Sequence, residues 1–274
     1  MSSINTNVMS LNAQRNLNAS SGALATSMQR LSSGLRVNSA KDDAAGLAIA
    51  ERMNAQVKGM NVAIRNANDG ISMAQTAEGA LGKVGDSLQR MRELAVQSAN
   101  ASNSASDRTN LNAEYQQLND EVTRVLTGTK FNGVDLLNTA ATLTFQVGAN
   151  NVTTDQIAVS TTVLTTGTGV AAVTAGDITS DTNALAAMDD LDDAIDEITT
   201  ARATFGAVQN RFDAVISNLQ VASENQAASR GRIMDADFAK ETANLSRSQI
   251  LQQAGTAMVA QANQLPQQVL SLLR

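Results

Sequence analysis

An acidic run from Met188 to Glu197 is the stretch whose residue types could carry chemistry. At helical spacing, Asp189, Asp193 and Asp196 share one face, and clustered carboxylates are ligands that Ca²⁺ accepts. The run lacks the glycine-centred loop of a dedicated calcium site. Acidic residues in the first turns of a helix are favoured by the helix dipole and by solvation. We therefore interpret the run as a solvated helix face.

Side-chain catalysis has few candidates in this composition. The chain has no Cys and no His, which excludes disulfides, thiolate metal sites and His-based acid–base chemistry. Paired carboxylates could transfer protons, but no nucleophile–base pair or glycine-rich phosphate loop accompanies them. The sequence therefore predicts no enzyme and no cofactor.

Net charge and hydropathy narrow the partners. The 274 residues carry 20 basic and 26 acidic side chains, a net charge of −6, so a nucleic-acid partner is not expected. No apolar run approaches the roughly 20 residues that span a bilayer, so membrane insertion is not expected. The first residues lack the basic and apolar regions of a cleaved secretory signal.

The apolar composition favours long, closely packed helices. Aromatic residues are 2% of the chain, so burial depends on small aliphatic side chains and ten Met. Small apolar residues suit helices packed along their length. A single proline, Pro266, leaves long helices uninterrupted.

Apolar residues recur at helical spacing through most of the chain, on both sides of a middle stretch with a different period. Helices are expected over residues 2–35, 44–99, 107–128, 183–229 and 235–274. Asp42 or Asp43 could cap the second helix, and Asp107 the third. Gly231 marks the expected break before the last helix.

Three glycines, Gly79, Gly82 and Gly85, lie inside the long second helix. Each costs about 1 kcal/mol relative to Ala, yet the apolar seam continues beyond them. We interpret them as a point where another helix crosses closely.

The middle of the chain changes to a period of two. Residues 142–147 alternate, residues 148–151 form a turn, and residues 156–159 return, which predicts a β-hairpin. Residues 161–182 are rich in Thr, Ala and Gly and are expected to form an exposed loop or short irregular insert. The order of elements is nearly palindromic, so the chain should turn at the hairpin and bring its two ends together.

The last stretch of the chain carries a heptad seam. One position of the heptad holds Leu251, Met258, Leu265 and Leu272, and its partner position holds Gly255, Ala262 and Val269. The seam runs almost to the last residue, whereas terminal residues are usually polar and frayed. We expect the other end of the chain, or another copy, to cover it.

Long motifs in both terminal parts and in the middle resemble bacterial flagellin. They are SINTNVMSLNAQRNLN, LSSGLRVNSAKDDAAGLAIAERM, LQRMRELAVQSAN, FNGVDLL, FQVGAN, GAVQNRFDAVISNLQ, DADFAKETANLSRSQILQQAG and QANQLPQQVLSLLR. The resemblance covers nearly everything outside residues 152–182. The large outer domains of longer flagellins are missing.

The resemblance implies a mainly α fold: a long antiparallel helical coiled-coil rod with a small β-hairpin region and paired N- and C-terminal helices. Residues 1–43 and 231–274 would form the inner tube of a filament. Residues 44–140 and 183–230 would form the rod, with the hairpin and exposed insert at 141–182.

The resemblance also implies partners and a location. The chain would be exported uncleaved by the flagellar type III apparatus and polymerise into the extracellular flagellum used for swimming. Its partners would be copies of itself, an export chaperone, and the filament cap and junction proteins. The alternatives are a hook–filament junction protein and, from a different class, a cytosolic coiled-coil scaffold.

Two groups of site residues follow. The apolar side chains expected to mediate polymerisation are Ile4, Val8, Leu11, Leu24, Met28, Leu31, Leu251, Met258, Leu265, Val269, Leu270, Leu272 and Leu273. By its match to a recognised flagellin segment, the chain would also bind Toll-like receptor 5. The residues at that surface, which we also expect to pack between subunits, are Gln89, Arg90, Glu93, Leu94 and Glu114. Leu94 is expected to be exposed beside Arg90.

Overall fold

The chain is mainly helical, as the sequence predicts. The computed structural model describes residues 6–272, and the side chains of residues 6–264. Its main elements are α1 (Val8–Ser33), α2 (Ala44–Ser98), α3 (Ala105–Gly128), β1 (Lys130–Phe131), β2 (Val134–Asp135), β3 (Thr142–Gln146), β4 (Gln156–Ser160), α4 (Thr168–Ala175), α5 (Asp181–Met234) and α6 (Phe238–Leu272).

Two compact units divide the chain. One comprises Met1–Ala55 and Asn225–Arg274, and the other Gln56–Glu224. Helices α2 and α5 contribute to both. The chain breaks between helices lie near the expected boundaries at residues 43 and 231, but the terminal unit reaches further along both long helices. The assignment to tube and rod stays a prediction.

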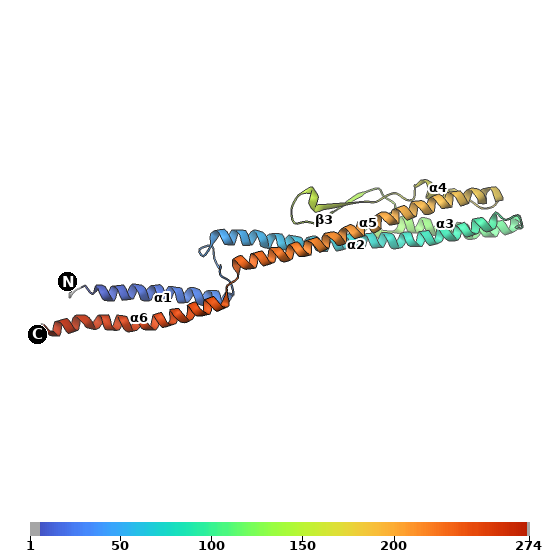
Figure 1. Cartoon of the computed structure of the whole chain (residues 1–274). Coiled ribbons are helices and arrows are strands. Elements are labelled where there is room, and N and C mark those ends of the chain that lie inside the picture. Colours follow the sequence, from blue (N-terminus) through green and yellow to red (C-terminus); the bar gives the residue numbers. More distant parts are fainter. Residues whose placement is uncertain (1–5, 273–274) are drawn as a thin grey trace. The chain divides into compact units, whose positions relative to one another are not determined.

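In the second unit, α2 and α5 run antiparallel (Figure 1). The Arg92 guanidinium donates to the Asp192 carboxylate, and further along Gln209 donates to Glu78 at 2.8 Å. Alanine and leucine side chains from both helices fill the core between them. Gly70 admits the ring of Phe212, since a Cβ there would lie 2.6 Å from it. The predicted antiparallel helical rod is therefore confirmed.

The predicted β-hairpin is also confirmed. Strands β3 and β4 pair antiparallel from Thr142–Ser160 to Gln146–Gln156. The hairpin lies against the long helices (Figure 1). Phe145 contacts Phe212 edge to face, with ring centroids 5.5 Å apart, and the Gln146 carbonyl accepts a hydrogen bond from Asn66.

The prediction of an exposed loop at residues 161–182 is wrong. The segment includes α4 and buries Leu164, Val170, Val173 and Ile178 in the core. Its backbone is held by α3: the carbonyls of residues 174 and 176 accept from Asn119 and Gln116, and the Ile178 amide donates to Asn112. Its many Thr and Gly residues conceal the few apolar side chains that anchor it.

The predicted close crossing at the glycines of α2 is also wrong. A Cβ added at Gly79, Gly82 or Gly85 would meet no atom within 4 Å. The helix face covered within this unit is the adjacent one, which carries Leu81 and Leu88.

The helix ends confirm one predicted cap and correct another. Asp43 caps α2 as expected, accepting from the Gly46 amide at 2.8 Å. The cap of α3 is Ser104, and Asp107 is its reciprocal partner in a capping box. Hydrogen bonds from Ser104 lower the pKa of Asp107.

Helix α5 does not break at Gly231 but continues to Met234. A single glycine costs only about 1 kcal/mol, and residues beyond it pack in a small cluster with Val37 and Ala50. The sequence analysis also missed the tight turn between β1 and β2. Asn132 and Gly133 both have positive φ there, and the Asn-Gly pair is the usual signal for such a turn.

Candidate assembly surface

Helices α1 and α6 lie side by side and antiparallel in the terminal unit (Figure 1). Small and polar residues line their contact. The buried ones are Ser10, Ser27, Glu241, Ser248 and Ala262. Gly255 also lies there, and a Cβ on it would come within 3.1 Å of the Leu17 side chain.

Hydrogen bonds set the register of this pair. At one end, Asn7 donates to the Ala262 carbonyl at 2.6 Å and Ser10 donates to Asn263 at 2.8 Å. Toward the other end, Ser27 and Arg30 donate to the Glu241 carboxylate at 3.1 and 3.2 Å. The residues that this contact buries completely are polar or small, and its larger apolar residues are only half-buried: Leu17, Leu24, Leu31, Leu245 and Val259. Its hydrophobic stabilisation is therefore smaller than that of a fully buried leucine seam.

Other large apolar side chains of the pair are exposed to solvent. Those at least half exposed are Val8, Met9, Leu11, Met28, Phe238, Ile250, Leu251 and Met258. A helix in a self-sufficient fold turns its apolar face toward the core. Contiguous exposed apolar surface marks an interaction site.

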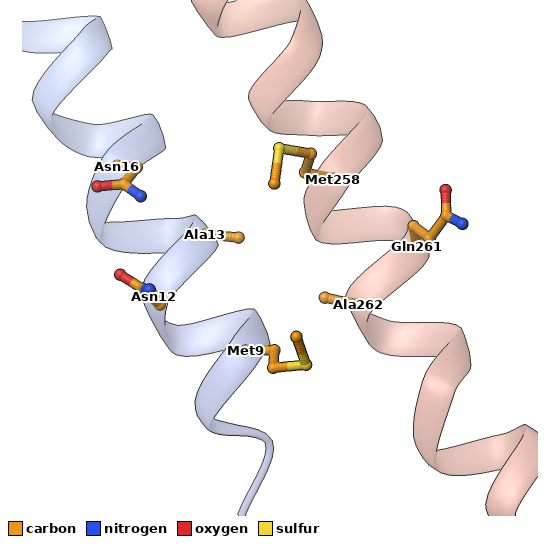
Figure 2. Close-up of a pocket in the computed structure, with 7 residues that line it drawn as sticks. All are labelled: Met9, Asn12, Ala13, Asn16, Met258, Gln261 and Ala262. Atoms are coloured by element: carbon orange, nitrogen blue, oxygen red, sulfur yellow. The ribbon is translucent and has the colours of Figure 1, made fainter.

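Part of this surface is hollowed into a groove of about 340 Å³ between the two helices. Figure 2 shows Met9 and Met258 projecting into it from facing helices, with Ala13 and Ala262 between them. The remaining lining residues are Asn12, Asn16 and Gln261. The groove has an apolar centre and carries amides along its sides.

The residues expected to mediate polymerisation differ in their exposure to solvent. Val8, Leu11, Met28, Leu251 and Met258 are exposed, and Leu24 and Leu31 are half-buried. Met9, Phe238 and Ile250 are also exposed on these helices but were missed, because they fall outside the heptad positions. Outside the described residues or side chains lie Ile4, Leu265, Val269, Leu270, Leu272 and Leu273.

The two apolar positions of the heptad in α6 also differ in exposure. Gly255 and Ala262 face α1, whereas Leu251 and Met258 are exposed. Among the heptad residues whose side chains are described, only one of the two positions is therefore covered by α1.

The second predicted group surrounds Arg90 in the other unit. Its guanidinium donates to Glu93 at 2.7 Å and, through two nitrogens, to Glu114 on α3 at 2.9 and 3.1 Å. Hydrogen bonds from Glu93 and then Glu114 raise the pKa of Arg90. Gln89, Arg90, Glu93 and Glu114 are all exposed, so the structure brings four of the five predicted residues to the surface.

The expectation for Leu94 is wrong. Its side chain is 1% exposed and belongs to the hydrophobic core. Helix α2 contacts both α3 and α5 here, through Arg90–Glu114 and Arg92–Asp192, so the buried arc is wider than a two-helix seam. The exposed apolar residue nearby is Val96.

The acidic run of residues 188–197 lies within α5, and its Asp189, Asp193 and Asp196 are exposed to solvent. Among residues 6–272, no group of three or more potential ligands is arranged to hold a metal ion. No helix in this range has the length and hydropathy needed to cross a bilayer.

Comparison with known proteins identifies the family. The bacterial flagellin N-terminal helical region matches residues 4–142, and the bacterial flagellin C-terminal helical region matches residues 188–273. The chain belongs to the flagellin family. A flagellin from Halalkalibacterium halodurans is 48% identical over 275 residues, with 99% of each chain covered. A flagellin from Xenorhabdus nematophila is 46% identical over 311 residues, again with 99% coverage of both.

A solved flagellin structure has a similar fold. The crystal structure of Bacillus cereus flagellin matches with a TM-score of 0.51 and 33% identity, covering 61% of this chain and 94% of that one. Flagellins are structural proteins and not enzymes, so the chain is a structural subunit of the flagellar filament. As a flagellin, it is expected to polymerise with itself.

Proposed function

We propose that the exposed apolar surface of α1 and α6 is the contact through which copies of the chain pack into the inner tube of the filament. One observation carries this: the pair buries Ser10, Ser27 and Glu241 while exposing large apolar side chains. Covering those side chains yields roughly 25 cal/mol per Å² of apolar area. A second copy supplies the same kind of surface at every step of growth.

Charged substitutions on this surface test the proposal. The double variant Ile250→Asp and Leu251→Asp introduces two carboxylates where the next copy should pack, so seeded elongation should fall by at least about tenfold. Gln253→Asp adds a carboxylate to an exposed polar position of the same helix and should elongate at close to the wild-type rate. Circular dichroism of each monomer shows whether the helices persist. Wild-type elongation by the double variant would refute the assignment.

The expected partners extend this proposal. An export chaperone would shield the same α6 surface before the chain leaves the cell, and cap and junction proteins would meet it at the ends of the filament. The family membership and the exposed Leu251 and Met258 support this. Titrating the chaperone against the charged double variant tests this proposal. The variant that elongates poorly should also bind the chaperone more weakly than wild type does. Undiminished binding would show that the chaperone binds another part of the chain.

A second candidate function is binding to Toll-like receptor 5 at Gln89, Arg90, Glu93 and Glu114. The exposed ion-pair cluster supports it, since Arg90 is held in one orientation by two carboxylates. In a receptor reporter assay on monomer, Arg90→Ala should reduce signalling. Arg124→Ala is the matched control, because Arg124 forms a similar exposed pair with Glu121. Equal signalling by both variants would exclude this site.

We also propose that the same cluster packs between subunits in the filament. Reduced motility of Arg90→Ala, together with reduced signalling, is the expected result. Full motility with lost signalling would show that the cluster serves the receptor contact alone.

A further inference from the structure

The methionines of this chain are sorted by exposure. Of ten, Met1 lies outside the described residues, which leaves nine. The three that are more than half exposed all lie on α1 and α6: Met9, Met28 and Met258. The other six are buried or half-buried: Met53, Met60, Met73, Met91, Met188 and Met234. Among the described methionines, the most exposed ones therefore lie on the two helices of the proposed assembly surface.

Two of the exposed methionines share one site. Met9 is 67% exposed and Met258 is 64% exposed, and both side chains project into the groove between the helices (Figure 2). Met28 lies elsewhere on α1 and does not line the groove. It is therefore a natural internal comparison.

The chain has few other side chains that react readily with oxidants. The chain has no Cys, no His and no Trp, and its single tyrosine, Tyr115, is fully buried. Among the side chains that oxidise readily, exposed methionine is thus the available class. Among the nine described methionines, a peroxide that meets a free subunit should react first at Met9, Met28 and Met258.

We propose that Met9 and Met258 form an oxidation-sensitive site that controls whether a subunit can join a filament. This rests on the proposed function of the groove as an assembly contact. A lone pair on the thioether sulfur attacks one peroxide oxygen, an S–O bond forms and the O–O bond breaks. The sulfur is oxidised by two electrons to the sulfoxide, and hydrogen peroxide is reduced to water.

The product is incompatible with an apolar contact. A sulfoxide is polar and a strong hydrogen-bond acceptor, whereas methionine packs as a flexible apolar side chain. Met9 and Met258 meet across Ala13 and Ala262, whereas the amides of Asn12, Asn16 and Gln261 lie on the outer sides of the helices (Figure 2). A sulfoxide oxygen at the apolar centre of the groove has no donor beside it there, and such an oxygen is costly to bury under the next copy.

Assembly and oxidation therefore compete for the same atoms. In a free subunit the groove is open, and its sulfurs are accessible. In a filament the next copy covers it, so Met9 and Met258 become resistant while remaining unmodified. The site acts on subunits before incorporation and spares those already in place.

The experiment compares hydrogen peroxide treatment of full-length monomer and of filament. Peptide mass spectrometry measures oxygen uptake at each methionine, and seeded elongation measures assembly. Met9 and Met258 should oxidise several-fold more slowly in filament, and oxidised wild-type monomer should elongate at least about tenfold more slowly than untreated monomer. Methionine sulfoxide reductase with a thiol reductant should restore the rate, because sulfoxide formation is reversible.

Variants locate the effect. Each is compared only with its own rate before peroxide. Met28→Leu should remain as sensitive as wild type, whereas the double variant Met9→Leu and Met258→Leu should lose most of its sensitivity. Leucine has a similar volume and lacks the sulfur.

Three results of the elongation assay would overturn the inference: normal elongation by monomer that carries both sulfoxides, equal sensitivity of the double variant, or no recovery after reductase treatment. Equal oxidation of Met9 and Met258 in monomer and filament would do the same. Failure of untreated wild-type monomer to elongate from seeds would instead refute the proposed function.

Discussion

Replacing Leu94 by alanine separates a core role from a receptor contact. Leu94 is 1% exposed, within the cluster formed by α2, α3 and α5. Truncating a buried leucine loses the transfer free energy of its side chain and leaves a cavity, together about 2–5 kcal/mol. Val96, two residues further along α2, is 50% exposed. Its replacement by alanine should cost less than about 0.5 kcal/mol.

The assay is thermal unfolding of full-length monomer by circular dichroism. For a loss of about 3 kcal/mol in a unit of this size, the melting temperature of Leu94→Ala should fall by roughly 6–12 °C. Val96→Ala should melt within about 2 °C of wild type. An unchanged melting temperature for Leu94→Ala would refute its placement in the core.

Receptor signalling completes this test. At a temperature well below its melting transition, Leu94→Ala should signal like wild type, because the buried side chain presents no surface to a receptor. Lost signalling from a fully folded Leu94→Ala monomer would show that the side chain becomes exposed on binding.

Three further predictions concern other parts of the chain. Burial, with smaller contributions from Asp190 and Asp177, raises the pKa of Tyr115 from 10.0 to about 12. Stability from this group should be full below pH 10 and be lost as the pH rises toward 12, and alkaline unfolding of Tyr115→Phe should lack that loss. Replacing residues 161–182 with a Gly/Ser linker of equal length should lower the melting temperature and prevent assembly, since the linker cannot supply the segment's buried apolar side chains. Hydrogen exchange should show α1 and α6 weakly protected in monomer and strongly protected in filament, with α2 residues 67–95 protected in both; protection of α6 in monomer equal to that of α2 would contradict this.

Hydrophobic periodicity was sufficient to predict the elements in which apolar residues recur at a regular spacing. The long helices and the β3–β4 hairpin follow from periods that persist over many residues. Residues 161–182 carry no sustained period, because α4 is short and its flanking segments are held by side chains of α3. Those hydrogen bonds join residues 55–66 positions apart in the chain. No pattern among neighbouring residues in the sequence predicts these hydrogen bonds.

The error about the exposure of Leu94 has a physical cause, the number of neighbours that a helix has. Near Leu94, α2 has two neighbours, and it buries Met91, Leu94, Ala95 and Ser98, an arc wider than one seam. A heptad reading assumes a single neighbour and leaves Leu94 outside.

Helix α6 shows the opposite mismatch. In the described part of the chain α1 packs against it and covers the row from Glu241 through Gly255 to Ala262. The fully buried residues of this row are polar or small, and Leu245 and Val259 are half-buried. Ile250, Leu251 and Met258 lie beyond that row. Between residues 67 and 95 of α2 the large apolar side chains are covered, whereas on α6 Ile250, Leu251 and Met258 are at least half exposed. That difference indicates surface reserved for further helices, and among the partners of a self-polymerising family the nearest source of such helices is the next copy of the chain.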